Sequence, residues 1–511
     1  MNFLLLTLFL PLVGFLVILL LPRHSKAPFT AALLITLATF LTSLGLIGPV
    51  LRNGSQFSST VDYVWINTPS MQIHFHAGVD GINLWLLLLT TLLLPVAVWM
   101  TESLIAEDRR KPFFALLLMF EFGIVGVFSV LDLFGFYVFW EIALVPMYLL
   151  VGSFGGPQRI GAAMKFFVYT MTGSVLMLSC ILYLHHLAGT FDYVEIYSRL
   201  ASGQAVLSPR EQLLLFLGFF AAFAVKVPIV PFHTWLPATY TEAPAPATFL
   251  LAAVMSKMGT YGLLRYAVAL FPGGAHHYAR WIAALAIIGI VYGALLALIQ
   301  PNIKRLIAYS SVSHLGFIVL GLFTFTQQGA DGAVYQMVAH GLSTGALFLL
   351  AGYLEQRRGS MEIADFGGIA SPAPGLATAF LITLLASIGL PTLCNFIGEF
   401  LVLQGAALTK FSWAVWAALG VILSAAYMLW MYQRTFLGKP NARNAAFPDL
   451  GGRDWAAIVP LIALMVWLGC YTQSFLPPIS AATSRILEQG RQNEEYRVQL
   501  PTQLTELRHE R

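Results

Sequence analysis

Charged residues are scarce in this chain. Of its 511 residues only 10% are Asp, Glu, Lys or Arg, whereas 58% are hydrophobic, and the mean hydropathy is +0.76. A soluble domain carries about 25% charged residues, so a chain this apolar could not cover a water-facing surface. The sequence therefore predicts a membrane protein in a lipid bilayer. The net charge of +4 does not indicate nucleic-acid binding, because the basic residues lie between apolar stretches and form no patch.

Cysteine is also rare. The three cysteines, Cys180, Cys394 and Cys470, lie in separate apolar stretches, which argues against disulfides, an iron–sulfur site or a zinc site. The sequence has no Gly-rich dinucleotide motif after a strand, no Walker loop and no obvious pair of haem ligands. We therefore expect no cofactor and no metal in this chain, and an energy source that lies in a partner or in an ion gradient.

Long apolar runs are the dominant feature. A membrane-spanning helix needs roughly 20 mainly apolar residues. The first run has no basic start and no small-residue cleavage site, so we interpret it as a spanning helix and not as a signal peptide. The runs are too long for barrel strands and do not alternate, which predicts an all-α polytopic membrane protein. About fourteen spans are expected, at 3–22, 29–49, 82–104, 113–130, 132–153, 163–186, 211–230, 245–270, 279–299, 303–324, 330–354, 374–400, 412–437 and 454–472.

Loop charges predict the orientation, because cytoplasmic loops are enriched in Lys and Arg. One alternate set of loops contains Arg23, Lys26, Arg109, Arg110, Lys111, Arg159, Lys304, Arg305, Arg357, Arg358, Arg434, Lys439, Arg443 and Arg453. The opposite loops between helices contain only Arg52, Arg199, Arg210, Arg280 and Lys410. We expect the first set to be cytoplasmic, in a bacterial inner membrane, with both termini in the periplasm. The polar tail from about Ser484 is expected to be a surface or subunit-contact segment.

An internal repeat is visible. GAAMKFF begins at Gly161 and GAVYQMV begins 171 residues later, at Gly332. The spans at 211–230 and 374–400 are each interrupted by proline, in KVPIVPF (Pro228) and in GLPTLCNFIGEF (Pro391). A shift of five helices inverts the topology, so these segments predict inverted repeats. Broken helices at matched positions of inverted repeats indicate an ion path near the membrane midplane.

Ionisable residues lie inside several predicted spans, where each costs at least ~2.5 kcal/mol on insertion scales. Lysine can carry a proton whose affinity depends on burial and on a nearby carboxylate, and histidine can donate and accept near neutral pH. Together they predict a proton relay, with a switch where Glu141 moves toward or away from Lys226. The candidate relay residues are Glu141, Lys226, Lys257, His314, His340 and Glu399, with Lys165, Glu121 and His233 as possible additional members.

Six motifs carry a resemblance to a known family. They are FWEIALVPMYLL, FAVKVPIVPFHTWLP, SKMGTYGLLR, IKRLIAYSSVSHLGF, MVAHGLSTGALF and FIGEF. Jointly they resemble the antiporter-like M-type subunits of the proton-pumping NADH:quinone oxidoreductase, respiratory complex I. The resemblance extends from Val79 to about Pro440.

The resemblance implies two inverted five-helix repeats, helices 4–8 and 9–13. Under this division residues 1–110 form helices 1–3, 111–270 the first repeat, 279–437 the second, and 438–511 helix 14 and the tail. It also implies that Glu141 pairs with Lys226, that Lys257 is the central proton carrier, and that His314 and His340 occupy connecting positions of the relay. Glu399 favours the M type, because L- and N-type subunits have lysine there.

The same resemblance implies L- and N-type subunits as partners, and NADH, FMN, iron–sulfur clusters and quinone bound by other subunits. The chain departs from the family pattern at three positions. Ala238 stands where an acidic residue is usual, Tyr240 stands near a usual histidine, and Thr392 replaces a glycine.

Three alternative functions are compatible with part of this pattern of membrane spans and buried charges. A multisubunit cation/proton antiporter uses a homologous fold, and a hydrogenase or CO2-uptake variant of the complex comes from the same lineage. A purely structural membrane scaffold is the third alternative, but it does not explain why so many costly charges lie inside the predicted spans.

Overall fold

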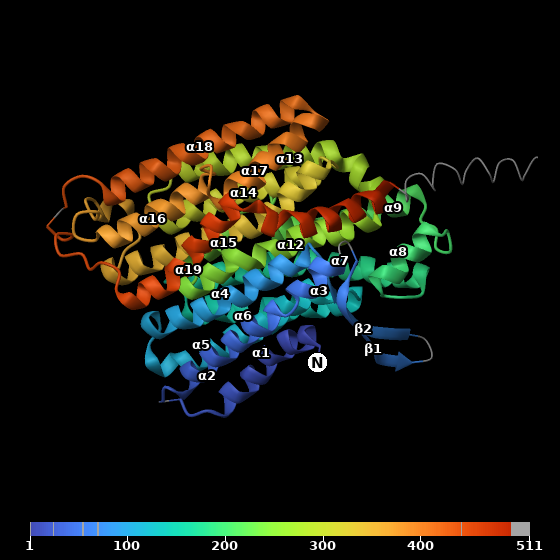
Figure 1. Ribbon diagram of the computed structural model, residues 1–511, viewed down its shortest axis with the longest axis horizontal. Helices are drawn as coiled ribbons and strands as arrows, with labels where there is room; N and C mark the ends of the chain where they lie inside the picture. The colour runs from blue at the N-terminus through green and yellow to red at the C-terminus, as the bar shows by residue number, and fades with distance from the viewer. Residues whose placement is uncertain (1, 24, 54–55, 69–70, 441, 492–511) are drawn as a thin grey trace, which may run out of the picture.

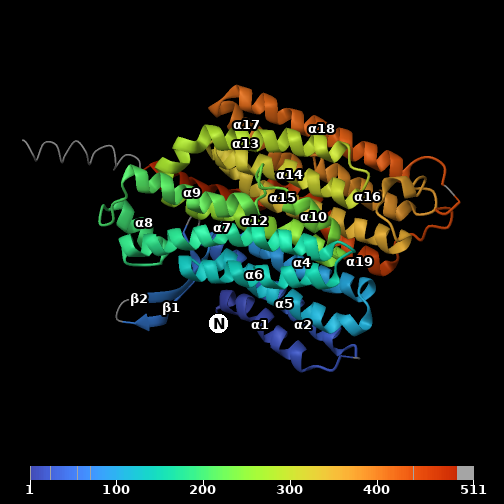
Figure 2. The ribbon, with the colours of Figure 1, turned by 180° about the vertical axis from the view of Figure 1, so that it is seen from behind.

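The structure is a computed structural model that describes residues 2–23, 25–53, 56–68, 71–440 and 442–491. Long helices lie side by side along the longest axis of the molecule, as both views show (Figures 1 and 2). In chain order the elements are α1 (Phe3–Leu20), α2 (Ala27–Leu44), α3 (Ile47–Asn53), β1 (Ser58–Thr68), β2 (Met71–Val79), α4 (Asn83–Leu104), α5 (Glu107–Ser129), α6 (Leu133–Phe154), α7 (Arg159–Ala188), α8 (Tyr193–Ala201), α9 (Pro209–Lys226), α10 (Trp235–Glu242), α11 (Ala245–Leu250), η1 (Leu251–Met255), α12 (Ser256–Gly262), η2 (Leu263–Val268), α13 (Pro272–Leu298), α14 (Ile303–Leu322), α15 (Gln327–Arg358), η3 (Ile363–Asp365), α16 (Pro374–Ser387), α17 (Cys394–Thr409), α18 (Phe411–Phe436), α19 (Gly452–Cys470) and η4 (Thr472–Ser474).

The expected membrane helices are present. In the described part of the chain, twelve helical segments are long and apolar enough to cross a membrane. The two expected spans outside this set, 211–230 and 374–400, correspond to the broken helices α9–α10 and α16–α17. The polytopic helical fold is therefore confirmed, and the count of fourteen crossings remains a prediction.

An antiparallel hairpin, β1–β2, is the part of the fold that an all-α prediction missed. It projects with α8 from one end of the bundle, which we call the hairpin end; the segments after α15 and α18 lie at the opposite end, the loop end (Figure 1). The sequence of β2, MQIHFHAGV, alternates in polarity with the period of a strand. A search for 20-residue apolar runs cannot detect such a short element.

Both predicted interruptions are confirmed. The chain leaves helical geometry between α9 and α10, around Pro228, and between α16 and α17, around Pro391. Proline lacks a backbone N–H and clashes with the preceding turn, so it ends a helix. In each break a side chain from the next segment caps a carbonyl of the preceding helix. The indole of Trp235 donates to Val225 O at 2.8 Å, and the amide of Asn395 donates to Ser387 O at 3.2 Å.

The second break also requires unusual backbone angles. Gly389 has φ +77° and Thr392 has φ +78°. Glycine adopts this region freely, but a β-branched residue there is strained. Thr392, the predicted departure at this break, therefore stands where the backbone favours glycine.

The helical segment from α11 to η2 lies in the middle of the molecule and is completely buried. Two π-helical turns, η1 and η2, flank the short helix α12. Such turns are rare in proteins, and many of those that do occur lie at functional sites. After α19, residues 476–491 form a further helix. This helix includes Ser484, the predicted start of the polar tail. Residues 492–511 of the tail lie outside the described residues.

Candidate functional site

Lys257 lies in α12, and its side chain is fully buried. Its Nζ donates to Ala252 O at 2.6 Å and to Ser256 Oγ at 3.2 Å, and lies 2.9 Å from His340 Nδ1. Ala252 belongs to the π-helical turn η1, so this turn presents a carbonyl to the ammonium. The hydroxyl of Tyr240 donates to Leu251 O at 3.0 Å and braces the same turn. The sequence-predicted central carrier is therefore held on one side by backbone and joined on the other to a histidine.

Lys257 is the first member of a row of buried titratable side chains, and two histidines and a glutamate continue it. The rings of His340, on α15, and His314, on α14, have centroids 5.6 Å apart. His314 Nδ1 lies 2.7 Å from Glu399 Oε1, on α17. On the opposite edge of the imidazole, His314 Nε2 lies 3.5 Å from the hydroxyls of Ser424 and Tyr427, both on α18. The structure thus brings four predicted residues from four helices into one buried row.

Glu399 has a second partner that sequence reasoning missed. Gln336 Nε2 donates to Glu399 Oε1 at 3.0 Å, and the Gln336 side chain is fully buried. Gln336 precedes His340 by four residues on α15, so both lie on one face of that helix. A polar residue one turn before a buried histidine is the signal that could have identified it. A Cβ at Gly389 would lie 3.0 Å from Glu399 Oε2, so glycine in the break leaves room for the carboxylate.

Glu141 and Lys226 lie apart from this row and make no direct contact. Neither Lys226 Nζ nor Glu141 Oε1 has a hydrogen-bond partner within the described ranges. Lys226 Nζ instead lies over the rings of Trp140 and Phe166, 5.0 and 5.6 Å from their centroids. The Glu141 carboxylate is near enough to act on the ammonium electrostatically. An unpaired buried lysine at the end of a broken helix can change partners, which is what the predicted switch requires.

The three additional candidates occupy different surroundings. Glu121, on α5, is fully buried, and neither of its oxygens has a partner in the part of the chain that the structure describes. His233 lies in the first break, with its ring 5.6 Å from that of Tyr292. Lys165 lines a cavity at the loop end and does not join the central row.

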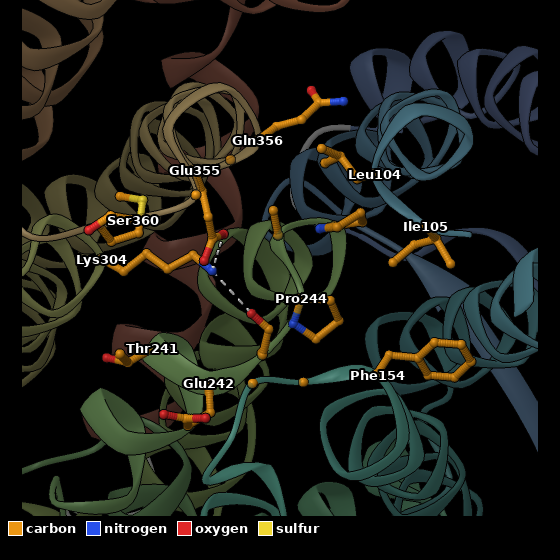
Figure 3. A pocket seen from close by; sticks show the side chains of 18 of the residues that line it. Leu104, Ile105, Phe154, Thr241, Glu242, Pro244, Lys304, Glu355, Gln356 and Ser360 are labelled. Atoms are coloured by element: carbon orange, nitrogen blue, oxygen red, sulfur yellow. Dashed lines mark hydrogen bonds and ion pairs between the residues drawn. The ribbon is translucent and has the colours of Figure 1, made fainter. Parts of the chain in front are cut away.

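Two of the cavities at the loop end lie near the start of the first repeat and of α14. The larger, of about 510 Å³, is bordered by the ends of α4, α6 and α15, the α10–α11 junction and the start of α14. Figure 3 shows the side chain of Lys304 reaching across its wall, where Nζ lies 2.6 Å from Glu355 Oε2 and 3.4 Å from Ala243 O. The second, of about 260 Å³, is lined by Lys165 and by Ala238, one of the departures from the family pattern. Glu242 borders both cavities.

Nothing in the described ranges groups three or more His, Cys, Asp or Glu side chains so that they could hold a metal ion. Cys180, Cys394 and Cys470 are unpaired. The chemistry that this site supports is therefore the exchange of protons among amine, imidazole and carboxylate groups.

Comparisons with known proteins identify the family of the chain. Residues 130–425 match the family model described as NADH:quinone oxidoreductase/Mrp antiporter, transmembrane. A protein named NADH-quinone oxidoreductase subunit M from Rhodobacter capsulatus is 40% identical over 91% of this chain and 92% of its own length. A protein of the same name from Mycobacterium tuberculosis is 38% identical over 93% of this chain and 92% of its own length.

Solved structures show the same fold. A chain of respiratory complex I from Thermus thermophilus superimposes with a TM-score of 0.85 at 33% identity, over 95% of this chain and 99% of that one. A chain of the Mrp complex from Dietzia gives a TM-score of 0.82 at 21% identity, a likeness of fold alone. With matches over most of its length, the chain belongs to the family of transmembrane subunits of NADH:quinone oxidoreductases and Mrp antiporters.

Proposed function

We propose that this chain translocates protons across the membrane as a subunit of an NADH:quinone oxidoreductase, respiratory complex I. One observation carries the proposal: Lys257, His340, His314 and Glu399 form a buried row in which neighbours lie at hydrogen-bond or ring-contact distance. Each of these costly groups has a titratable neighbour, which a scaffold does not require. The relatives at 36–40% identity named subunit M support complex I over an independent antiporter.

In this proposal the loop end faces the cytoplasm and the hairpin end faces the periplasm of a bacterial inner membrane. Protons enter near the cavities around Glu242, reach Lys257, and pass through the histidines to Glu399. Lys226 and Glu141 act as the switch that controls the proton affinity of Lys257. L- and N-type subunits are the proposed neighbours, and the other subunits bind NADH, FMN, iron–sulfur clusters and quinone.

The two broken helices support the division into inverted repeats at 111–270 and 279–437. Their breaks lie at 227–234 and 388–393, around the two prolines whose spacing suggested the repeat. Each break is next to the row or to the switch: Lys226 is the last residue of α9, and Glu399 lies in the second turn of α17.

The test is NADH-driven proton pumping in membrane vesicles that carry Lys257→Gln, with assembly of the complex checked in parallel. We expect assembly to be retained and pumping to collapse, because glutamine cannot carry the proton between Ser256 and His340. Lys410→Gln, an exposed lysine at the hairpin end, is the matched control and should pump normally. Normal pumping by an assembled Lys257→Gln complex would contradict the proposal.

Glu141→Ala, measured in the same assay, tests the switch separately. Loss of both pumping and quinone reduction in an assembled complex is expected if the glutamate is coupled to the redox reaction. Unchanged rates of both would contradict the Glu141–Lys226 switch and leave the central row untouched.

A further inference from the structure

Two cavities beside α2 lie away from the proton relay. The first is an apolar groove of about 310 Å³ that is lined by α2, α4 and α19. Leu33, Leu37 and Phe40 line it from α2, and Ala456 and Pro460 line it from α19. Figure 2 shows α2 at the outer edge of the bundle, as does Figure 1, so the groove opens to the outside of the bundle.

The second cavity, of about 70 Å³, lies at the loop end of α2 and is basic. Its charged lining consists of four cations and two carboxylates: Arg23, Lys26, Arg110, Lys111, Glu102 and Glu107. Glu102 pairs with Arg453, which places a fifth cation at the edge of the cavity. Positive charge therefore exceeds negative charge among these side chains, and the cavity attracts an anion.

The cations around the basic cavity have donors to offer to such an anion. Lys111 Nζ donates to two backbone carbonyls at the end of α1, at 2.9 and 2.5 Å, and Arg110 Nε donates to Ile105 O at 2.8 Å. These bonds hold both side chains in place but use only some of their donors, because an ammonium has three N–H groups and a guanidinium has five. Arg23 and Lys26 are exposed at the rim.

The two cavities adjoin along α2. Phe29 borders the basic cavity and Trp99 borders the groove, and their ring centroids are 6.1 Å apart. The Arg453 guanidinium lies 6.0 and 4.7 Å from these two centroids. From Phe29 to Phe40, α2 rises about 16 Å, which is about half of the ~30 Å hydrocarbon core of a bilayer. Together the cavities therefore present cations at the membrane surface and an apolar groove about as deep as one leaflet.

We propose that this site binds one anionic phospholipid, with its phosphate among the cations of the basic cavity and one acyl chain in the groove between α2 and α19. Basic pockets between membrane helices bind the head groups of acidic lipids. The inference does not depend on the proposed function, because no residue of the proton relay takes part in it.

A helix of a neighbouring subunit fits the groove less well than an acyl chain. The floor from Leu92 to Trp99 is about two helical turns long, and two turns of a helix 10 Å in diameter occupy roughly 800 Å³. This is more than twice the volume of the groove, which is about 310 Å³. A partner helix would cover the groove without filling it, and an uncharged lipid would leave the cations without a counter-charge.

The experiment is photocrosslinking of the assembled complex in phosphatidylcholine vesicles that contain a small fraction of phosphatidylglycerol with a diazirine in one acyl chain. Labelled peptides are identified by mass spectrometry. We expect label within 33–40, 92–99 and 456–460, at a yield at least about fivefold higher than with the same diazirine in phosphatidylcholine, since each cation near the surface contributes about this factor.

Two variants with matched controls test the two halves of the site. Lys26→Gln should lower the labelling by phosphatidylglycerol about fivefold, whereas Lys410→Gln, an exposed lysine at the hairpin end, should not change it. Ala456→Phe places a ring in the groove from an exposed position and should remove the label there. Val459→Phe, an exposed position on the same helix that does not line the groove, should keep it.

Three results would overturn the inference. Equal labelling by the two probes would indicate general contact with lipid, and no label in the groove would indicate that a partner subunit covers it. Wild-type labelling of both assembled variants, Lys26→Gln and Ala456→Phe, would show that these cavities do not hold the lipid. If Lys26→Gln does not assemble, Arg23→Gln makes the same comparison.

Discussion

Replacement of Glu399 by glutamine is the sharpest test of the buried row, because it removes the proton acceptor and keeps the shape. Glu399 Oε1 accepts from Gln336 at 3.0 Å and contacts His314 at 2.7 Å, and a glutamine oxygen can take both roles. Hydrogen bonds to charged groups contribute about 1.5–3 kcal/mol and neutral ones about 0.5–1.5. The free energy of unfolding should therefore fall by about 1–2 kcal/mol, which leaves a protein of ordinary stability folded.

The effect on transport should be much larger. A positioned acid or base accelerates proton transfer by about 10²–10⁴-fold, and the amide in Glu399→Gln can neither take nor release a proton at neutral pH. We expect NADH-driven pumping by the assembled complex to fall below about one tenth of the wild-type rate.

The assay is the initial rate of acidification of inverted membrane vesicles after addition of NADH, normalised to the amount of assembled complex. Glu102→Gln is the control, since Glu102 pairs with Arg453 at the loop end, far from the row. Surface pairs of this kind contribute about 0–1 kcal/mol, and the control should pump normally. An assembled Glu399→Gln complex with a wild-type ratio of protons to NADH would refute the argument that the row carries the proton.

Three further outcomes follow from the geometry. Gln336→Leu removes one hydrogen-bond donor from Glu399 and should lower the pumping rate roughly tenfold at unchanged assembly, the effect of losing about 1.5 kcal/mol of hydrogen bonding. Gln336→Asn keeps the amide on a shorter side chain and so tests only whether the amide reaches Glu399. Equal pumping rates in Gln336→Leu and the wild type would remove Gln336 from the site. Thr392→Gly removes the strain of a left-handed backbone angle and should raise the free energy of unfolding by about 1 kcal/mol, measured by thermal unfolding of the complex. A lower free energy of unfolding in this variant would contradict the argument that Thr392 is strained. Burial alone would lower the pKa of His76, but its hydrogen bond to Asp192 and the Asp192 charge raise it, so this contact stabilises the hairpin below about pH 6.5 and is lost as the pH rises through the raised value. The protection of the β2 amides, which is their exchange rate relative to the intrinsic rate at each pH, should therefore fall as the pH rises above about 6.5 in the wild type but not in His76→Gln.

Sequence reasoning located the four members of the central row and both broken helices, because each leaves a local signal. A lysine or glutamate inside an apolar run, and a proline in mid-span, can be read without knowledge of the neighbours. The partners of these groups could not be read. Lys257 and His340 are 83 residues apart, and His314 and Glu399 are 85 apart. Their contact depends on how four helices pack, which no single run determines.

The omissions have equally specific causes. Gln336 lies one helical turn before His340, but the search for buried ionisable groups did not include an uncharged amide. The hairpin was missed because a two-stranded element outside the membrane is invisible to a search for spanning helices. The expectation that Glu141 pairs with Lys226 was drawn from the family resemblance, and the structure shows the two side chains near each other but without a hydrogen bond.

The two π-helical turns around α12 have a consequence for which changes in chain length this helix can tolerate. A wide turn holds one residue more than a regular α-helical turn needs, so deleting one residue from η1 would restore regular geometry without breaking the backbone hydrogen bonds. The helical segments on either side would keep nearly the same relative orientation, because the wide turn absorbs the extra residue within one rotation. The carbonyl of Ala252, which accepts from Lys257 Nζ at 2.6 Å in the wide turn, would instead accept a backbone N–H of the regular helix and no longer hold the lysine. A single deletion in a buried segment could thus leave a stable membrane helix and still abolish transport, so that fold and function respond to different residues of the same turn.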